Sequence, residues 1–420
     1  MKKTLRDNRG SITTIVTVTA LFFSIILSTA YMVASTNRKT QLKSELTARE
    51  TYEKPLNNLD EIREEVTGLP RTAETQPYFP SSDFKRISGT DLSNGLVIED
   101  LDGNQYVWVE VPKNEDVYPT AGLNIVSFTD DEYTKIENDL HTYTSVYRNG
   151  TTYSDTWVAD NGNEGWYTES EYYAQKKKML KSVYQNGGFY VGRYEAGIAV
   201  NRTSDTEKNS AGKYIAPSAV PVSKVDAYPY TYVTRTQAKV LAEKVNSGNY
   251  TSSLMFGVQW DLVLAFMSKD TAKVTDTSIL TSNSTSIGNY FNASFDLNRG
   301  RYVSFELRLS NEWNNFDKAL DAMVVRNETT GKMKKMEQSI YINGVKLTTG
   351  GTEQSKVMNI YDMAGNVYEW TVEKPSNIDN AATRRGGGYI NSGMESPAFY
   401  RTYLGTGVTD DDNGFRVSIY

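Results

Sequence analysis

The segment from Asn359 to Thr371, N-I-Y-D-M-A-G-N-V-Y-E-W-T, constrains the fold of this chain more than any other. Its Gly365-Asn366 pair adopts positive φ at low cost and predicts a tight turn. The four residues that follow are β-branched, aromatic or acidic in alternation, which predicts a strand. Asp362 and Glu369 flank the turn, and carboxylates beside free carbonyls suit a hard cation such as Ca²⁺. The alternative is a plain turn and strand with two solvated acids.

The segment Ile360–Thr371 resembles the G-L-Y-D-M-x-G-N-V-W-E-W-T signature of the formylglycine-generating enzyme, or sulfatase-modifying factor, family. Four other segments resemble further blocks of that family and follow in its order: Phe189–Ala196 (F-Y-V-G-R-Y-E-A), Leu254–Asp261 (L-M-F-G-V-Q-W-D), Arg385–Tyr389 (R-G-G-G-Y) and Gly414–Val417 (G-F-R-V). The resemblance covers residues 95–420. It implies an α+β, C-type-lectin-like domain that is rich in loops and has short antiparallel strands and two helices.

The resemblance also implies roles for individual residues. A structural Ca²⁺ ion would be held by Asp362, the carbonyls of Gly365 and Val367, and Glu369, which all offer the oxygen ligands that Ca²⁺ prefers. The other motif residues would be structural: Trp260, Trp370 and Tyr389 as core aromatics, Gly386–Gly388 for close backbone approach, and Arg416 in a buried pair or carbonyl clamp. Tyrosine stands at positions 368 and 389 where the family has tryptophan, which indicates a divergent member.

The chemistry of the family does not transfer, because the chain has no cysteine and only one histidine, His141. The enzymes it resembles oxidise a substrate cysteine with copper held by two cysteines, and no other side chain replaces thiolate for Cu(I). Related iron enzymes need a histidine cluster, and serine or cysteine relays need a histidine partner. Two carboxylates remain able to serve a hydrolase, but no spacing singles out a pair. We therefore expect no copper, iron or nucleotide, and no catalytic residues.

The N-terminal sequence predicts a membrane anchor. Residues 1–9 carry four basic side chains and one acid, and we expect them in the cytoplasm. Residues 10–36 contain no charge and predict a single transmembrane helix, which places the C-terminal domain outside the cell. A cleaved secretory signal is the rival interpretation. The start also resembles a type IV prepilin, cut after Gly10, although Ile15 stands where pilins have glutamate.

Beyond the anchor, residues 37–66 place leucines at helical spacing among charges and predict a helical stalk. The stalk either oligomerises through a short coiled-coil seam or packs on the globular part. Residues 67–94 are rich in Pro, Gly, Ser and Thr and predict a linker.

The globular domain, 95–420, has recognisable elements. The sequence predicts a hairpin over 96–111 with an Asp102-Gly103 turn, and then an insertion, 113–188, without a family counterpart. The insertion ends in a helix with a capping box at Thr168 and a stop at Gly187, and we expect His141 on its surface. Further elements are expected in order: a strand over 189–196, helices over Thr234–Asn246 and Gln259–Met267, and strands over Tyr302–Leu309 and Ser339–Leu347.

We expect ligand binding on the loops of Gly388–Asp412, which are rich in aromatic and charged side chains of the kinds favoured in recognition surfaces. The candidate residues are Tyr389, Asn391, Tyr400, Arg401, Tyr403 and Asp410. The formal net charge of −6 argues against a nucleic-acid partner. The sequence thus favours a non-catalytic extracellular binding or adhesion module for a protein or glycan. A pilin-like or secretion-apparatus component with an adhesive domain, and an enzyme of this fold with other chemistry, are the alternatives.

Overall fold

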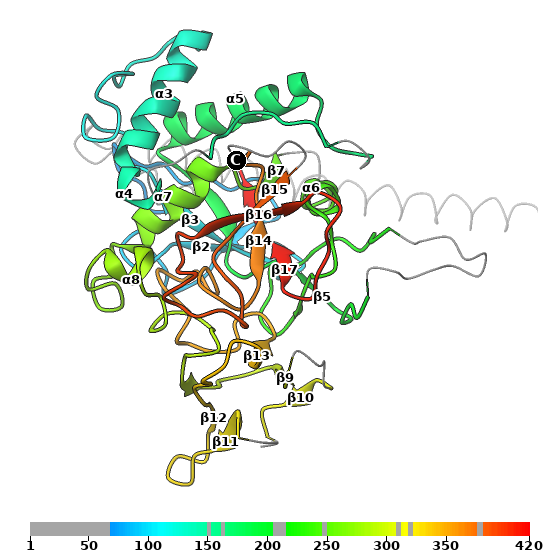
Figure 1. Ribbon diagram of the computed structural model, residues 1–420. Helices are drawn as coiled ribbons and strands as arrows, with labels where there is room; N and C mark the ends of the chain where they lie inside the picture. Colours follow the sequence, from blue (N-terminus) through cyan, green and yellow to red (C-terminus); the bar gives the residue numbers. More distant parts are fainter. Residues whose placement is uncertain are drawn as a thin grey trace, which may run out of the picture. The chain divides into compact units, whose positions relative to one another are not determined.

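The computed structural model describes residues 68–148, 153–160, 164–204, 216–245, 250–307, 312–317, 322–375 and 381–420. Leu69–Tyr420 form one compact unit of mixed α+β structure with mostly short, antiparallel strands and few helices (Figure 1). This confirms the α+β class. The expected anchor, 10–36, and stalk, 37–66, lie outside the described residues. Within the part of the chain that is described, no helix combines the length and the apolar character needed to cross a bilayer.

A six-stranded antiparallel sheet organises the unit, in the order β1-β2-β3-β4-β18-β7. Its strands are β1 (Lys85–Arg86), β2 (Val97–Glu99), β3 (Gln105–Glu110), β4 (Gly188–Gly192), β7 (Ser252–Leu254) and β18 (Val417–Ile419). The β2–β3 hairpin turns at Asp102-Gly103, where Gly103 has φ 84°, as predicted. The last strand lies between β4 and β7, so the C-terminal residues complete a sheet whose other strands lie far earlier in the sequence.

Side chains of this sheet alternate between two apolar clusters, as the two-residue period of a strand requires. One face contributes Val97, Val107, Val109, Phe189 and Val191 to the main core, which also contains the buried helix residues. The other face contributes Ile98, Tyr106, Trp108, Tyr190 and Ile419 to a smaller cluster with Leu69 and Phe84.

The smaller cluster changes the expected boundary of the domain. Leu69 is fully buried in it, and Thr75 links to the sheet: its hydroxyl donates to the Gly187 carbonyl (2.8 Å) and accepts from the Trp108 indole (2.8 Å). The segment 69–94, which we expected to be linker, therefore covers one face of the sheet. Its prolines and polar residues hid this role, because only a few of its side chains are apolar.

Three helices confirm the predicted caps and patterns. Helix α5 (Glu169–Asn186) begins with a capping box at Thr168 and ends at Gly187 in the left-handed conformation (φ 67°). Helix α6 (Arg235–Glu243) begins with a capping box at Thr234. Helix α7 (Gly257–Met267) is buried almost all round, as its nearly continuous apolar sequence predicts.

Helix α3 (Asp130–Tyr143) was not predicted; it lies in the insertion and also has a capping box, formed by Thr129 and Glu132. The short helices α4 (Ser145–Arg148) and α8 (Ser278–Thr281) were not predicted either. In Figure 1, α3 and α5 lie together at one end of the unit.

A second, four-stranded sheet contains the signature segment, in the order β16-β15-β14-β17. Its strands are β14 (Tyr368–Trp370), β15 (Ala381–Arg385), β16 (Arg401–Gly405) and β17 (Asn413–Phe415). Strand β14 runs antiparallel to β15, with Glu369 opposite Arg385, and parallel to β17. The resemblance blocks around Glu369, Arg385 and Phe415 thus meet in one sheet, with β16 at its edge.

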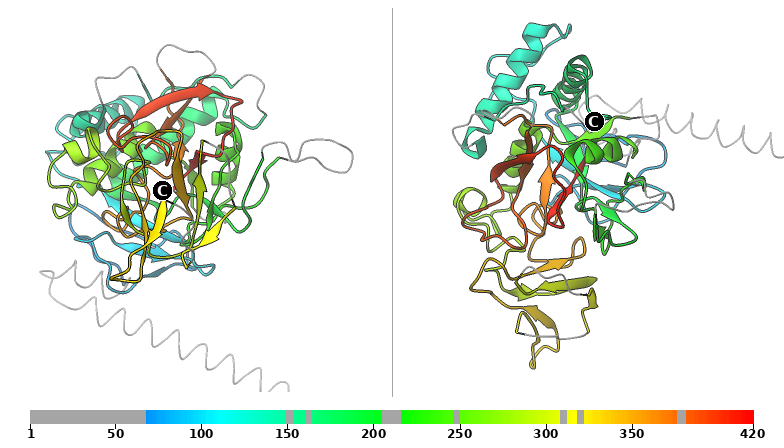
Figure 2. Two further views of the ribbon diagram at one scale, coloured as in Figure 1. Left: turned by 60° about the horizontal axis from the view of Figure 1, so that its bottom comes forward. Right: turned by 45° about the vertical axis from the view of Figure 1, so that its right-hand side comes forward.

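Small sheets form the end opposite α3 and α5, as Figure 1 and the right-hand view of Figure 2 show. They contain β8 (Phe295–Asp296), β9 (Arg301–Phe305), β10 (Asn314–Asn315), β11 (Val324–Arg326), β12 (Met333–Lys335) and β13 (Gly344–Leu347), while β5 (Gly197–Ile198) and β6 (Tyr228–Pro229) pair separately. Strand β13 is shorter than the expected Ser339–Leu347, because residues 339–343 form bends and a turn.

Candidate functional site

The signature segment forms the predicted turn. Gly365 and Asn366 both have positive φ (74° and 58°), and a Cβ on Gly365 would lie 2.3 Å from the Asn289 carbonyl oxygen, so only glycine fits there. The Asn366 side chain fixes the turn by donating to Glu195 Oε2 (2.6 Å) and accepting from the Leu347 amide (3.0 Å). The turn is therefore held by groups on both sides.

The two predicted Ca²⁺-binding carboxylates are buried and have protein partners. Asp362 accepts from the Gly350 amide (2.8 Å) and from the Ser355 hydroxyl (2.6 Å). Glu369 accepts from Arg416 Nη2 (2.6 Å) and Nε (3.1 Å). Arg416 also donates to backbone carbonyls, which confirms the expected buried pair and carbonyl clamp. The Ca²⁺ site formed by these residues with Gly365 and Val367 stays a prediction.

Glu195, which was not among the predicted site residues, adds a third buried carboxylate to this region. It accepts from the Val367 amide (3.2 Å) as well as from Asn366. Burial and the nearby Asp362 and Glu369 raise the pKa of Glu195 well above its ordinary value, and burial also raises the pKa of the other two. Arg416 acts in the opposite direction on all three carboxylates but does not offset the rise in their pKa values. The region therefore favours an additional positive charge or a proton.

The predicted ligand residues near the start of the C-terminal loop, Tyr389 and Asn391, form hydrogen bonds within the protein. Tyr389 is buried, and its hydroxyl donates to Asp411 Oδ2 (2.5 Å). The ammonium of Lys346 lies 3.5 Å from the same carboxylate oxygen and 5.6 Å from the centre of the Tyr389 ring. Asn391 is half-buried and accepts from the Gly388 amide (2.9 Å), which closes the turn between them. Tyr389 is thus a core aromatic as well as a candidate ligand residue.

Strand β16 and the residue before it carry three further candidates, which differ sharply in exposure. Tyr403 is 44% exposed, Tyr400 is half-buried, and the side chain of Arg401 is only 4% exposed. The Arg401 guanidinium points inward, where Nε donates to Glu373 Oε1 (2.9 Å) and Nη2 pairs with Asp261. Tyr403 is therefore open to solvent, whereas the Arg401 ion pairs attach β16 to the interior of the protein.

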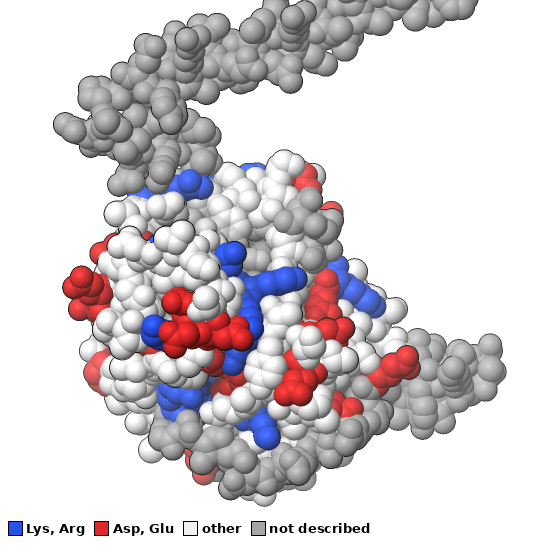
Figure 3. All heavy atoms as spheres, turned by 90° about the horizontal axis from the view of Figure 1, so that it is seen from above, with Lys and Arg blue, Asp and Glu red and all other residues white. Residues whose placement is uncertain are grey.

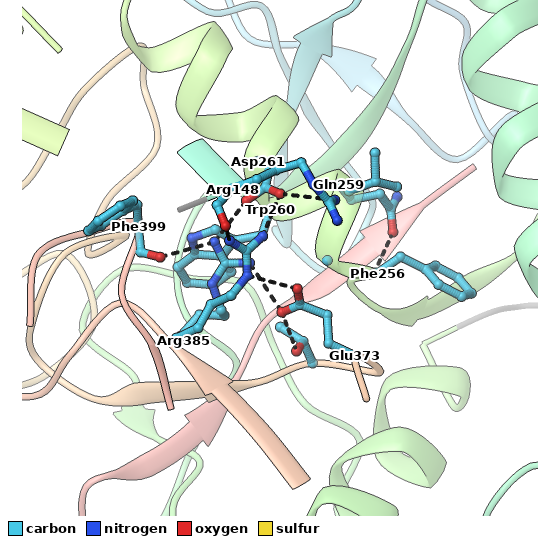
Figure 4. A network of polar contacts seen from close by, with 12 residues as sticks. Arg148, Phe256, Gln259, Trp260, Asp261, Glu373, Arg385 and Phe399 are labelled. Atoms are coloured by element: carbon cyan, nitrogen blue, oxygen red, sulfur yellow. Dashed lines mark hydrogen bonds and ion pairs between the residues drawn. The ribbon is translucent and has the colours of Figure 1, made fainter. Parts of the chain in front are cut away.

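Arg401 belongs to a buried ion network that joins β15 and β16 to helix α7. Figure 4 shows the part of this network around Asp261, Arg385 and Glu373. Asp261 of α7 accepts from Arg385 Nη2 (2.8 Å) and has Arg148 Nη1 at 3.7 Å. Glu373 Oε2 accepts from Arg385 Nη1 (3.1 Å). Against the raising effect of burial, Arg401 and Arg385 lower the pKa of Glu373 to about 2. Glu373 is therefore ionised across the physiological range, and the network holds the second sheet against α7.

Asp410 lies in an acidic cluster in the loop that follows β16. Carboxylate oxygens of Asp410, Asp411 and Asp412 lie within 4.8 Å of one another, and Asp410 is exposed. Two cations form ion pairs with the cluster: Lys346 with Asp411, and Arg384, whose Nη1 is 3.5 Å from Asp412 Oδ1. Burial raises the pKa of Asp412 to about 6, and Asp410 and Asp411 add to the effect. We call the surface of the loops Gly388–Asp412 the C-terminal face; of its candidate residues, Tyr403 and Asp410 are exposed.

His141 is not the surface residue that we expected. It is half-buried on α3, one turn after Glu137, and these two residues and Asp155 bring ligand atoms within 4.8 Å of one another. The Glu-x-x-x-His spacing on one helix face was the sequence signal for the pair. Lys176 already donates to Glu137 (2.8 Å) and to the Asp155 carbonyl (2.8 Å). Burial and nearby cations lower the pKa of His141 to about 3, so the imidazole is neutral at physiological pH.

The face that carries α3 and α5 shows Lys and Arg interleaved with Asp and Glu (Figure 3). Ion pairs in these helices account for part of this pattern, including Lys135 with Asp131 (2.6 Å) and Lys177 with Asp130 (2.6 Å). Among the described residues of this face, Lys and Arg do not form the continuous basic surface that nucleic-acid binding requires.

Comparison with known proteins identifies no family for this chain. No family model matches the sequence, and no curated protein matches it. Among solved structures, "Treponema denticola variable protein 1" is 12% identical over 55% of this chain and 84% of its own, with a TM-score of 0.29. PvdO from Pseudomonas aeruginosa is 14% identical over 56% of this chain and 81% of its own, with a TM-score of 0.26. Likeness at this level supports no argument about fold or function.

Proposed function

We propose that this chain is a non-catalytic extracellular binding or adhesion module, anchored to the cell membrane by residues 10–36. In this proposal residues 95–420 form a divergent C-type-lectin-like domain of the sulfatase-modifying-factor type. Its ligand, a protein or a glycan, contacts the C-terminal face around Tyr403 and Asp410. The anchor and the family assignment rest on the sequence patterns described above.

One observation supports binding over catalysis: the buried carboxylates behind β15 and β16 are paired with arginines and hold these strands in place. Asp261 and Glu373 are paired with Arg385 and Arg401, and these pairs fix β15 and β16 against α7. An active site keeps its acids and bases within reach of a substrate, with pKa values near the working pH. Here the pairs are buried, whereas Tyr403 on the same strand is left exposed. A rigid strand that presents an aromatic ring suits recognition.

The histidine content of the chain supports the same proposal. The one histidine is neutral and shielded, so it does not provide a base for a serine or cysteine relay.

The proposal is tested by binding of the full-length chain, kept soluble in a mild detergent, to defined probes. The probes are an array of purified glycans and immobilised fibronectin, collagen and mucin. Tyr403→Ala and Asp410→Asn should each weaken binding to the captured probe about tenfold or more, as expected for residues at the centre of an interface. Tyr341→Ala is the matched control, because Tyr341 is 60% exposed and lies outside this face. Binding that both site variants leave unchanged, or no binding to any probe, would refute the proposal.

A further inference from the structure

A polar pocket of about 500 Å³ lies outside the C-terminal face. Three segments line it: the turn at Gly89–Asn94, the loop after α7 at Lys269–Lys273, and Lys356–Asn359 of the segment that leads into the signature. The volume falls within the range of small-molecule sites, about 300–1,000 Å³. The pocket is therefore large enough for a ligand of monosaccharide size.

The lining has an excess of positive charge. It contains the three lysines Lys269, Lys273 and Lys356 and one acid, Asp270, which gives a net charge of +2. Lys269 pairs with Glu110 (2.6 Å), and Lys356 pairs with Glu353 (2.5 Å). Asp270 is thus the only carboxylate in the lining, and the pairing acids lie outside it.

Lys273 is the cation least compensated by an acid. Its ammonium donates to the backbone carbonyls of Glu353 (2.6 Å) and Gln354 (3.1 Å), which leaves the third of its N–H groups for a ligand. Burial and the neighbouring Lys356 lower the pKa of Lys273. Burial and the nearby Arg193 and Arg299 lower the pKa of Lys356 in the same way. In both lysines burial and neighbouring cations outweigh the effect of the nearby Asp270, which raises the pKa.

The wall beside Lys356 is fixed before any ligand arrives. Met358 and Asn359 are consecutive non-glycine residues with positive φ (47° and 63°). The Asn359 amide donates to the Asn94 and Gly95 carbonyls (3.0 and 2.9 Å), and its carbonyl and side-chain oxygens accept from Arg193. A Cβ on Gly95 would lie 2.1 Å from the Met358 carbonyl oxygen, so the two segments touch. A wall held in this way loses little entropy on binding.

We propose that this pocket binds a hydrophilic anion of monosaccharide size, with a carboxylate or phosphate group held by Lys273 and Lys356 and hydroxyl groups held by the polar lining. Charge-assisted hydrogen bonds to ammonium groups are about twice as strong as neutral ones. The pocket is separate from the C-terminal face, so this inference stands or falls independently of the proposed function.

Isothermal titration calorimetry of the full-length chain tests the inference with four probes: glucuronate, glucose 6-phosphate, inorganic phosphate and neutral glucose. We expect one of the sugar anions to bind saturably, with an affinity that falls as salt is raised, and glucose not to bind. Preference between the first two probes identifies the acidic group. Binding of inorganic phosphate as tight as that of both sugar anions would show an oxyanion site that ignores the sugar, and would overturn the inference.

Variants locate the site. Lys356→Gln should weaken binding about tenfold or more, and Thr271→Glu, which adds a carboxylate at an exposed lining position, should do the same without disturbing a buried contact. Lys178→Gln on α5 is the matched control and should change affinity less than twofold. Equal binding of glucose, absence of binding by either sugar anion, or equal losses in Lys178→Gln and Lys356→Gln would overturn the inference.

Discussion

We predict that the substitution Asp261→Asn, in the buried ion network, strongly lowers the stability of the fold. The Asp261 carboxylate is fully buried and receives Arg385 Nη2 at 2.8 Å, the Arg401 guanidinium, and Arg148 Nη1 at 3.7 Å. Asparagine keeps the shape but removes the charge, so Arg385 and Arg401 would have only Glu373 as an ionic partner, and Arg148 would lose Asp261. Breaking a buried pair in this way costs about 3–5 kcal/mol, because the remaining charges stay desolvated without compensation. We therefore expect the free energy of unfolding to fall by about that amount.

Urea unfolding of the full-length chain, followed by tryptophan fluorescence, measures this loss. The matched control is Asp131→Asn, the same substitution in an exposed pair with Lys135, for which we expect less than about 1 kcal/mol. The midpoint should shift while the urea dependence stays unchanged, which shows that stability and not compactness has altered. A loss below about 1 kcal/mol for Asp261→Asn would refute the reasoning. It would mean that the arginines find other partners and that the network does not anchor β15 and β16.

Two further predictions concern buried charge. Burial lowers the pKa of Lys335 to about 7, so the cost of its buried ammonium is fully present below that pH and disappears as the pH rises towards the ordinary lysine pKa. Between pH 7 and 10 the free energy of unfolding should therefore rise by about 4 kcal/mol relative to Lys335→Met, and parallel pH profiles would contradict this. For Ca²⁺ held by Asp362 and Glu369, EDTA should lower the melting temperature and Ca²⁺ restore it. An unchanged melting temperature and no bound calcium would remove both residues from the candidate site, and stoichiometric copper or iron would reopen an enzymatic role.

Local signals in the sequence were enough to predict much of the fold. The capping boxes at Thr168 and Thr234, the Gly187 stop and the Asp102-Gly103 turn depend on neighbours within a few residues, and the structure has all four. The same rule would have found α3 from Thr129 and Glu132. The strand ends were less predictable, because short strands depend on pairing with distant partners.

Exposure of the candidate site residues could not be predicted, because it depends on contacts that are distant in sequence. Tyr403 and Arg401 are two positions apart on one strand, and both residue types are common in recognition surfaces. Only the positions of Asp261, 140 residues earlier, and of Glu373, 28 residues earlier, decide that Arg401 is an anchor. The Lys269, Lys273 and Lys356 pocket was missed for the same reason, since its lysines come from two separate loops.

The signature segment shows the limit of transferring residues from a resemblance. Matching letters place Asp362 and Glu369 beside a turn, but they do not say which cation balances them. In the structure Arg416, 47 residues after Glu369, pairs with one of the two carboxylates, and Glu195 brings a third acid to the same region. One guanidinium among three buried carboxylates leaves negative charge that either protons or a bound cation must offset. The two cases separate by experiment: protonation makes stability fall as the pH rises and leaves it insensitive to EDTA, whereas a bound Ca²⁺ ion makes it sensitive to EDTA at neutral pH.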